Sequence, residues 1–459
     1  MNSGVEMRQI IAGVFGVALG VLIGGQAASA GYSNAVRLAF GAEEAGMGGA
    51  CVSLADDGDA PVCNPAGMVF QEGFTATSDG ALILAHPHYE DPQNPYIDGF
   101  EGGAGVGGFS DGGFVHRLKS LPVAYGIGLY TYSAIRMKYD FNTTLLTATG
   151  AEQRDVDMTL IHDRVIPSIA VQVTDNLALG AGYIRAYQTF SYATPGQFGN
   201  LVKPSALDGV NFYTDYHVDG WGQGGIFGAL LKLGKKTQFG VSYTTKMAVE
   251  MNGRDEVIFQ NNPLFPAPIS TNGTRNNYAI AMTWKWPQVL RTGVSHQLRD
   301  DLLLAFDWQW FDWSRANDKL EYVLSNGNNA AVNAVADAVG ANGGGIREAI
   351  RLDARDAHVF HFGTEYRPSE RVKLRAGYVF SNNPVPDRTV SPLYSGNFMH
   401  TISLGAGTKV KTWDVDVAWS HTYLHTQVVE TSEIEGGEFN FSETSNGADI
   451  FFLSLTKKF

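Results

Sequence analysis

The chain has 459 residues, 44% of them hydrophobic, and a formal net charge of −13. This acidic balance argues against a nucleic-acid partner. After the first thirty residues no apolar run is long enough for a membrane-spanning helix, so a membrane-embedded form of the chain would have to cross with strands that close into a barrel.

The first thirty residues have the pattern of an export signal. A continuous apolar run, Ile10–Ile23, follows Arg8 and precedes Ala28-Ser29-Ala30. A short apolar run that ends in small residues is typical of a cleavable signal peptide. We therefore expect residues 1–30 to be a signal peptide. The alternative, an anchoring helix, is disfavoured because the run is short and no basic stop-transfer cluster follows it.

Residues 31–71 are rich in glycine, alanine and turn residues. Such a compact segment cannot join a wall of alternating strands, so we expect it to form a hatch, or plug, inside a barrel. Within it, Asn64-Pro65-Ala66 predicts a tight turn that either abuts an opening in the wall or holds the plug together. Asp56 and Asp57 are expected to accept internal hydrogen bonds or to pair with lumenal arginines, because the loop lacks the oxygen ligands of a calcium site.

The two cysteines, Cys51 and Cys63, both lie in this segment. In an oxidising envelope, a disulfide that closes this short loop would stabilise the fold by about 3 kcal/mol. Two free thiols are the alternative. We expect no metal at the cysteines, because neither a second cysteine pair nor a histidine accompanies them.

From residue 72 onward, apolar and polar residues alternate, as in strands with two different faces. The segments 238–244, 413–420 and 451–456 show this pattern. Short polar turns alternate with long loops rich in glycine, asparagine and proline, which is typical of outer-membrane barrels. Residues 72–459 therefore predict an all-β fold, a transmembrane antiparallel β-barrel of about 14 strands with the N-terminal hatch inside its lumen.

Other features of residues 72–459 indicate how the barrel meets its surroundings. Tryptophans cluster near strand ends, at Trp284, Trp286, Trp308 and Trp310, which suits aromatic girdles at the membrane interfaces. Core packing is the alternative for part of them. The last strand ends at Phe459. The expected partners are outer-membrane lipid and lipopolysaccharide around the wall, and the barrel-assembly machinery at the C-terminal strand.

Several stretches, in order along the chain, match one known pattern: Arg37–Asp57 with Asn64-Pro65-Ala66, Gly220–Gly224, Trp286-Pro287-Gln288, Trp310–Ser314, Arg375–Phe380 and Asn383–Arg388. Together they resemble the FadL/TodX family of outer-membrane transporters. The resemblance implies passive transport of long-chain fatty acids or hydrocarbons in the bacterial outer membrane. It further implies capture by the outer loops and lateral release where a kinked third strand meets the hatch, without covalent chemistry.

Two stretches depart from the family pattern. The family's kink lies at a glycine late in the third strand, whereas Ser133–Arg136 here contains no glycine. In the fatty-acid members, a basic residue at the end of the fifth strand helps to hold the carboxylate, whereas Phe190–Thr194 is uncharged. The expected ligand is therefore either a fatty acid whose carboxylate is bound elsewhere or an uncharged aromatic or alkane hydrocarbon.

Two groups of residues are candidates for ligand contacts. Arg315 and Lys319 could bind a ligand carboxylate, since one cation in an apolar pocket would orient a fatty acid. Solvated loop charges are the alternative. Four apolar residues could form a groove that captures the ligand on the outer side, because an exposed apolar patch usually marks binding: Phe259, Leu264, Phe265 and Ile269. Simple packing within the loops is the alternative.

An enzyme barrel such as a lipase is a further alternative. Gly108–Gly112 fits the G-x-S-x-G pattern, but no helix pattern follows to form a nucleophile elbow. Four histidines are scattered without a catalytic signature: His86, His88, His162 and His400. We therefore predict no enzyme activity, no cofactor and no metal. A porin for polar solutes would have a charged constriction and no plug.

Overall fold

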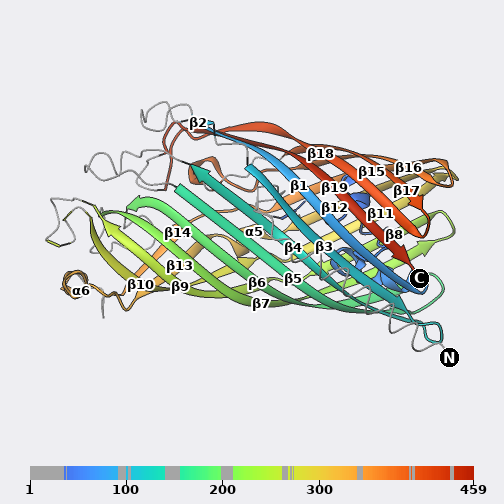
Figure 1. Ribbon diagram of the computed structural model, residues 1–459, viewed down its shortest axis with the longest axis horizontal. Coiled ribbons are helices and arrows are strands. Elements are labelled where there is room, and N and C mark those ends of the chain that lie inside the picture. Colours follow the sequence, from blue (N-terminus) through green and yellow to red (C-terminus); the bar gives the residue numbers. More distant parts are fainter. Residues whose placement is uncertain are drawn as a thin grey trace.

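The computed structural model describes residues 36–37, 39–90, 100–101, 105–139, 156–197, 210–260, 267–268, 271, 273–338, 345–391, 394, 399–434 and 439–459. The expected signal peptide, residues 1–30, lies outside the described residues, as do Leu264, Phe265 and Ile269. In the described part, tilted strands form a long barrel, and helical segments of the N-terminal region lie within it (Figure 1).

The strands follow one another around the wall in chain order. They are β1 (Phe74–Glu90), β2 (Phe100–Glu101), β3 (Gly105–Arg117), β4 (Val123–Tyr139), β5 (Val156–Gln172), β6 (Leu177–Gln197), β7 (Asn211–Leu233), β8 (Thr237–Thr244), β9 (Met247–Phe259), β10 (Thr274–Trp286), β11 (Val289–Arg299), β12 (Leu302–Phe311), β13 (Lys319–Ser325), β14 (Ile346–Arg351), β15 (Ala357–Ser369), β16 (Val372–Ser381), β17 (His400–Val410), β18 (Trp413–Val428) and β19 (Glu443–Lys458).

These strands make a closed antiparallel barrel of fourteen passes through the wall. The barrel closes where β1 pairs with β19, from Thr75 opposite Lys458 to Glu90 opposite Glu443. Some passes are interrupted. β10 and β11 form one pass that breaks at Pro287, because proline has no N–H to donate to a ladder. The predicted fold class is confirmed.

Burial alternates along the strands, as the sequence predicts. In β10, every second residue from Asn276 to Trp286 is buried, and the residues between them are exposed. The exposed face of the wall carries large apolar side chains, among them Leu82, Leu179, Phe227, Leu404 and Leu453. This face suits contact with lipid acyl chains.

The segment ahead of β1 folds into three short helices, α2 (Ala42–Gly46), α3 (Ala60–Cys63) and η1 (Pro65–Phe70). Figure 1 shows these helices in blue within the barrel. α2 contacts β16 to β19 and η1 contacts β3 to β7, so the segment spans the lumen from one side of the wall to the other. We keep the name hatch for residues 31–71, of which the structure describes 36–37 and 39–71.

A buried ionic network joins the hatch to the wall. The side chain of Arg375 on β16 is fully buried. Its guanidinium lies 2.9 Å from the Glu43 carboxylate of α2 as an ion pair, donates to Glu365 at 2.8 Å, and also pairs with Asp416. Burial alone would raise the pKa of Glu43, but Arg375, together with Lys373 and other nearby cations, outweighs it and lowers the pKa to about 2. Removing one partner of such a network leaves an uncompensated buried charge, which is strongly destabilising. The ion pair between Glu43 and Arg375 therefore holds α2 against β16.

Three further helical segments interrupt connections between strands: α5 (Trp313–Ala316), α6 (Ala330–Ala338) and η3 (Asp387–Thr389). Across the described ranges, no helix combines the length and the apolar character needed to cross a membrane.

Candidate functional site

The Asn64-Pro65-Ala66 turn lies against the wall strands β6 and β7. The Asn64 side-chain amide donates to the carbonyl oxygens of Val52, at 2.9 Å, and Ala229, at 3.1 Å, and its Oδ1 accepts from the Ala66 N–H. A Cβ on Gly228 would come within 2.1 Å of Asn64 Oδ1. The turn therefore fixes the hatch to the wall at a place where a wall glycine allows close approach.

The two predicted acidic residues of the hatch differ in their surroundings. Asp56 is exposed. The Asp57 carboxylate accepts from the Asp59 N–H at 2.9 Å, and the Asp57 carbonyl accepts from the Gln71 side chain at 2.7 Å. Asp57 is thus an internal acceptor of the hatch.

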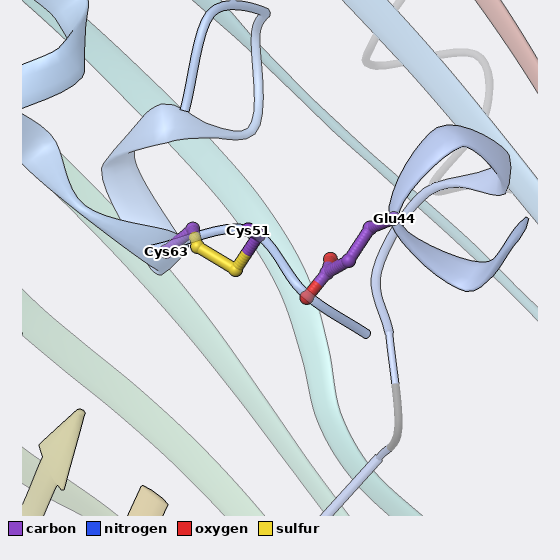
Figure 2. Close-up of side chains that lie close together, drawn as sticks. All are labelled: Glu44, Cys51 and Cys63. Carbon is purple, nitrogen blue, oxygen red and sulfur yellow. A yellow bond between two sulfur atoms is a disulfide. The ribbon is translucent and has the colours of Figure 1, made fainter. Parts of the chain in front are cut away.

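Cys51 and Cys63 form a disulfide, with their Cα atoms 6.1 Å apart. Figure 2 shows the disulfide beside Glu44 of α2. Because both sulfur atoms are bonded to each other, neither is a thiolate that could bind a metal with Glu44. The Glu44 carboxylate instead accepts from the Phe40 N–H at 2.9 Å, and burial raises its pKa to about 7.

The wall is incompletely paired between β3 and β4. Their ladder runs from Arg117 opposite Ala124 only as far as Gly112 opposite Leu129. Beyond it, β3 stays paired with β1 as far as Gly105, and β4 stays paired with β5 as far as Tyr139. We call this unpaired stretch, 105–111 of β3 facing 130–139 of β4, the wall gap.

Side chains replace the missing backbone ladder at the end of the wall gap where the β3–β4 pairing stops, next to Gly112 and Leu129. Asp111 Oδ1 accepts from the Thr131 N–H at 2.7 Å. Arg37 of the hatch donates to the Thr131 carbonyl at 2.8 Å and pairs with the Asp111 carboxylate. Its guanidinium also lies 3.2 Å from the centre of the Phe109 ring. An unpaired backbone group in lipid costs several kcal/mol, so these contacts make an open wall tolerable.

A β-bulge bends β4 at the same place. In the β4–β5 ladder, Thr131 pairs with Asp163 and Ser133 with His162, so Tyr132 is the extra residue. A bulge bends its strand and re-aims a side chain. The third pass is therefore distorted without a glycine in Ser133–Arg136, and the Tyr132 side chain is buried inside the barrel.

Tyr132 begins a chain of aromatic contacts through the lumen. Its ring lies 5.7 Å from that of Trp286, and Trp286 lies 6.0 Å from Trp313 and 6.3 Å from Trp284, measured between ring centres. Phe190 contacts Trp284 at 5.4 Å. We call these five residues the aromatic cluster. Trp284 and Trp286 thus face the lumen, so for them the girdle expectation was wrong and core packing was right.

A polar group is embedded in the aromatic cluster. Arg164 on β5 stacks on the Tyr132 ring at 3.3 Å and donates to His162 at 3.0 Å. Gln188 on β6 accepts from the Trp286 indole N–H at 2.8 Å and lies 3.0 Å from His162 Nδ1. Among the residues that the structure describes, no carboxylate lies within ion-pair distance of Arg164. Within the described part of the chain, Arg164 is thus a buried cation without an acidic partner.

Of the residues predicted to bind a ligand, the three that the structure describes are Arg315, Lys319 and Phe259, and they lie in different surroundings. The Arg315 side chain is 78% exposed and lies 3.5 Å from Asp312. Lys319 pairs with Glu321 at 2.7 Å on the exposed face of β13. Phe259, at the end of β9, is fully buried in the main hydrophobic core. None of the three has a described contact with Arg164 or the wall gap.

Sequence reasoning missed Arg37, Asp111 and Arg164. The only signal for Arg164 is its place in an alternating run, with Leu160 and Ile166 on the same face. That face turns out to be the inner one, where a fully buried arginine needs a partner.

Comparison with known proteins fits this geometry. The sequence profile of the family described as "Outer membrane protein transport protein (OMPP1/FadL/TodX)" matches residues 20–459. The chain belongs to this family. The predicted family and outer-membrane location are therefore confirmed, and this FadL/TodX-family chain is related to transporters and channels rather than to enzymes.

Two relatives and two solved structures show how distant the similarities are. A Neisseria meningitidis serogroup B protein, provisionally named as an outer-membrane protein, is 25% identical over 56% of this chain and 57% of its own length, so the chain spans less than two thirds of it. The long-chain fatty acid transport protein of Salmonella typhi is 24% identical over 75% of this chain and 76% of its own.

The structures of the Pseudomonas putida toluene transporter TodX and of a Pseudomonas aeruginosa FadL homologue have TM-scores of 0.71 and 0.70. They cover 92% and 93% of this chain and 99% of their own, at 19% and 17% identity. At such identities the likeness establishes the FadL/TodX barrel fold alone.

Proposed function

We propose that this chain carries small hydrophobic molecules from outside the cell through the aromatic cluster and out sideways through the wall gap into the outer membrane. The observation that carries the proposal is the incomplete β3–β4 ladder, which ends at Gly112 and Leu129 while both strands continue. The aromatic cluster touches the gap at Tyr132. An apolar molecule moving along this route would exchange one apolar contact for another without entering water.

Arg164 supports a carboxylate-bearing ligand, such as a long-chain fatty acid, as the main substrate. A buried guanidinium surrounded by aromatic rings and two neutral polar side chains offers charge-assisted hydrogen bonds to a carboxylate. Because Phe190–Thr194 lacks the basic residue that helps to hold the carboxylate in the fatty-acid members, a fatty acid would need a cation elsewhere in the barrel. Arg164 could be that cation. Uptake of an uncharged aromatic hydrocarbon is the second candidate, because the rings of the aromatic cluster would stack equally well on a neutral aromatic ligand.

Uptake measurements separate these two ligands. In cells that lack their own transporter, the chain should take up labelled oleate, and Arg164→Gln should lower uptake at low oleate about tenfold, since a hydrogen bond to a charged group contributes about 1.5–3 kcal/mol. Arg185→Gln is the matched control, because Arg185 lies on the outer face over Trp221. Uptake of labelled toluene alone would favour the hydrocarbon. Uptake of neither would refute the proposal.

The hatch is proposed to keep the barrel closed to small polar solutes. Deletion of residues 31–71 behind an intact signal peptide, residues 1–30, should raise conductance in planar bilayers. Unchanged conductance would contradict the plug. We further propose that lipopolysaccharide surrounds the exposed wall and that the barrel-assembly machinery inserts the chain through its C-terminal strand, which ends at Phe459. The proposed transport involves no covalent chemistry.

A further inference from the structure

The outer end of the barrel seam carries a histidine and two glutamates on one face. Tyr89 on β1 is fully buried, so the alternation of the strand places His88 and Glu90 together on the outer face. Glu443 on β19 is the direct cross-strand partner of Glu90. One ligand atom from each of the three side chains lies within 4.8 Å of the others.

The arrangement is unfavourable for the protein alone. Two like charges directly opposite each other on neighbouring strands destabilise a sheet, yet Glu90 faces Glu443 where the first and last strands meet. The His88 imidazole lies 3.3 Å from Glu90 and can hydrogen-bond to one of the two carboxylates. A divalent cation held between the three groups would neutralise both carboxylates.

The site is open to water. The His88 side chain is 33% exposed and that of Glu90 is 40% exposed. Six residues further down β19 from Glu443, Asp449 accepts from the Trp419 indole N–H at 2.9 Å, whereas Phe451 and Leu453 below it are exposed apolar side chains. A tryptophan at this level marks the membrane interface, so His88, Glu90 and Glu443 lie above the lipid tails.

We propose that His88, Glu90 and Glu443 bind a divalent transition-metal ion, for which Zn²⁺ is the probe. Imidazole nitrogen with carboxylate oxygens suits zinc rather than magnesium or calcium, which prefer all-oxygen sites. Three protein ligands leave one position for water. Because His88 and Glu90 belong to β1 and Glu443 to β19, the ion would join the two strands that close the barrel. The inference is independent of the transport proposal.

Calorimetric titration of the refolded full chain, without a histidine tag, tests the site. One Zn²⁺ should bind per chain. Loss even of an outer-shell partner lowers metal affinity roughly 10- to 100-fold, so His88→Ala and Glu443→Gln should each weaken binding at least about tenfold. His400→Ala is the matched control, because His400 is also on a strand near the outer end but is hydrogen-bonded to Tyr378 at 2.6 Å.

A second measurement reports on the seam itself. Zn²⁺ should raise the temperature at which the compact electrophoretic form of the barrel is lost in the unmodified chain and in His400→Ala, but not in His88→Ala or Glu443→Gln. Equal Zn²⁺ affinity in the unmodified chain and His88→Ala would overturn the proposal. So would binding that is lost in His421→Ala instead, because His421 pairs with Asp449 and not with the two glutamates.

Discussion

The carboxylate of Asp111 on β3 accepts a 2.7 Å hydrogen bond from the backbone N–H of Thr131 on β4, at the point where these two strands stop pairing. A side chain there takes the place of a ladder carbonyl, and its second oxygen pairs with Arg37 of the hatch. The opening in the wall and the position of the hatch are therefore coupled through one buried ion pair.

The coupling predicts a non-additive mutant cycle. Arg37→Met and Asp111→Leu should each destabilise the barrel by about 3–5 kcal/mol, because each leaves an uncompensated buried charge. The double variant should lose less than the sum of the two. Urea-induced unfolding in lipid vesicles, followed by tryptophan fluorescence, measures the difference. The exposed pair Arg299–Asp301 is the control, with an expected effect of about 0–1 kcal/mol. Additive losses at Arg37 and Asp111 would refute the coupling.

A second prediction concerns the close approach of hatch and wall. Gly228→Ala would place a methyl group 2.1 Å from Asn64 Oδ1, so the hatch turn or β7 must shift, at a cost of about 1–3 kcal/mol. Gly80→Ala is the matched control in another wall strand, because a Cβ there meets nothing within 4 Å. The same unfolding measurement should show little change for Gly80→Ala. Equal effects at both positions would contradict the close packing.

The barrel itself was predictable, because the period of two along a strand and the length of a turn are local properties. The residues that line the route through the barrel could not be predicted from the sequence. His162, Asp163 and Arg164 are consecutive polar residues, and alternation cannot say which of them faces the lumen. The bulge at Tyr132 exists only in the pairing of β4 with β5. Trp284 and Trp286 likewise alternate as interfacial residues would, yet they point inward.

The disulfide gives a third prediction. Cys51 and Cys63 are separated by 12 residues, and a bond that closes a loop of this size stabilises by about 3 kcal/mol. The double variant Cys51→Ser/Cys63→Ser should therefore show faster proteolysis of the hatch and a lower urea midpoint. Reductant should shift the unmodified chain towards the variant and leave the variant unchanged. A reductant effect on the double variant would show that the cause lies elsewhere.

The last prediction concerns Glu44, which lies beside the disulfide (Figure 2). Burial raises its pKa from 4.5 to about 7 in the folded chain. Between these two values the folded state binds more protons than the unfolded state, so the free energy of unfolding should fall as pH rises from about 4.5 to 7. Glu44→Gln should flatten this slope, because its amide stays neutral and can still accept from the Phe40 N–H.

The neighbouring Glu43 is the control for Glu44. Burial opposes the change, but Arg375, together with Lys373 and other nearby cations, lowers the folded pKa of Glu43 to about 2. Glu43 is therefore largely ionised in both states above pH 5. Its contribution is lost only as pH falls from about 4.5 towards 2. Glu43→Gln should thus lower stability at every pH from 5 to 8 and keep the slope. If the free energy of unfolding fell equally steeply for Glu44→Gln and the unmodified chain as pH rises from about 4.5 to 7, the assignment to Glu44 would be ruled out.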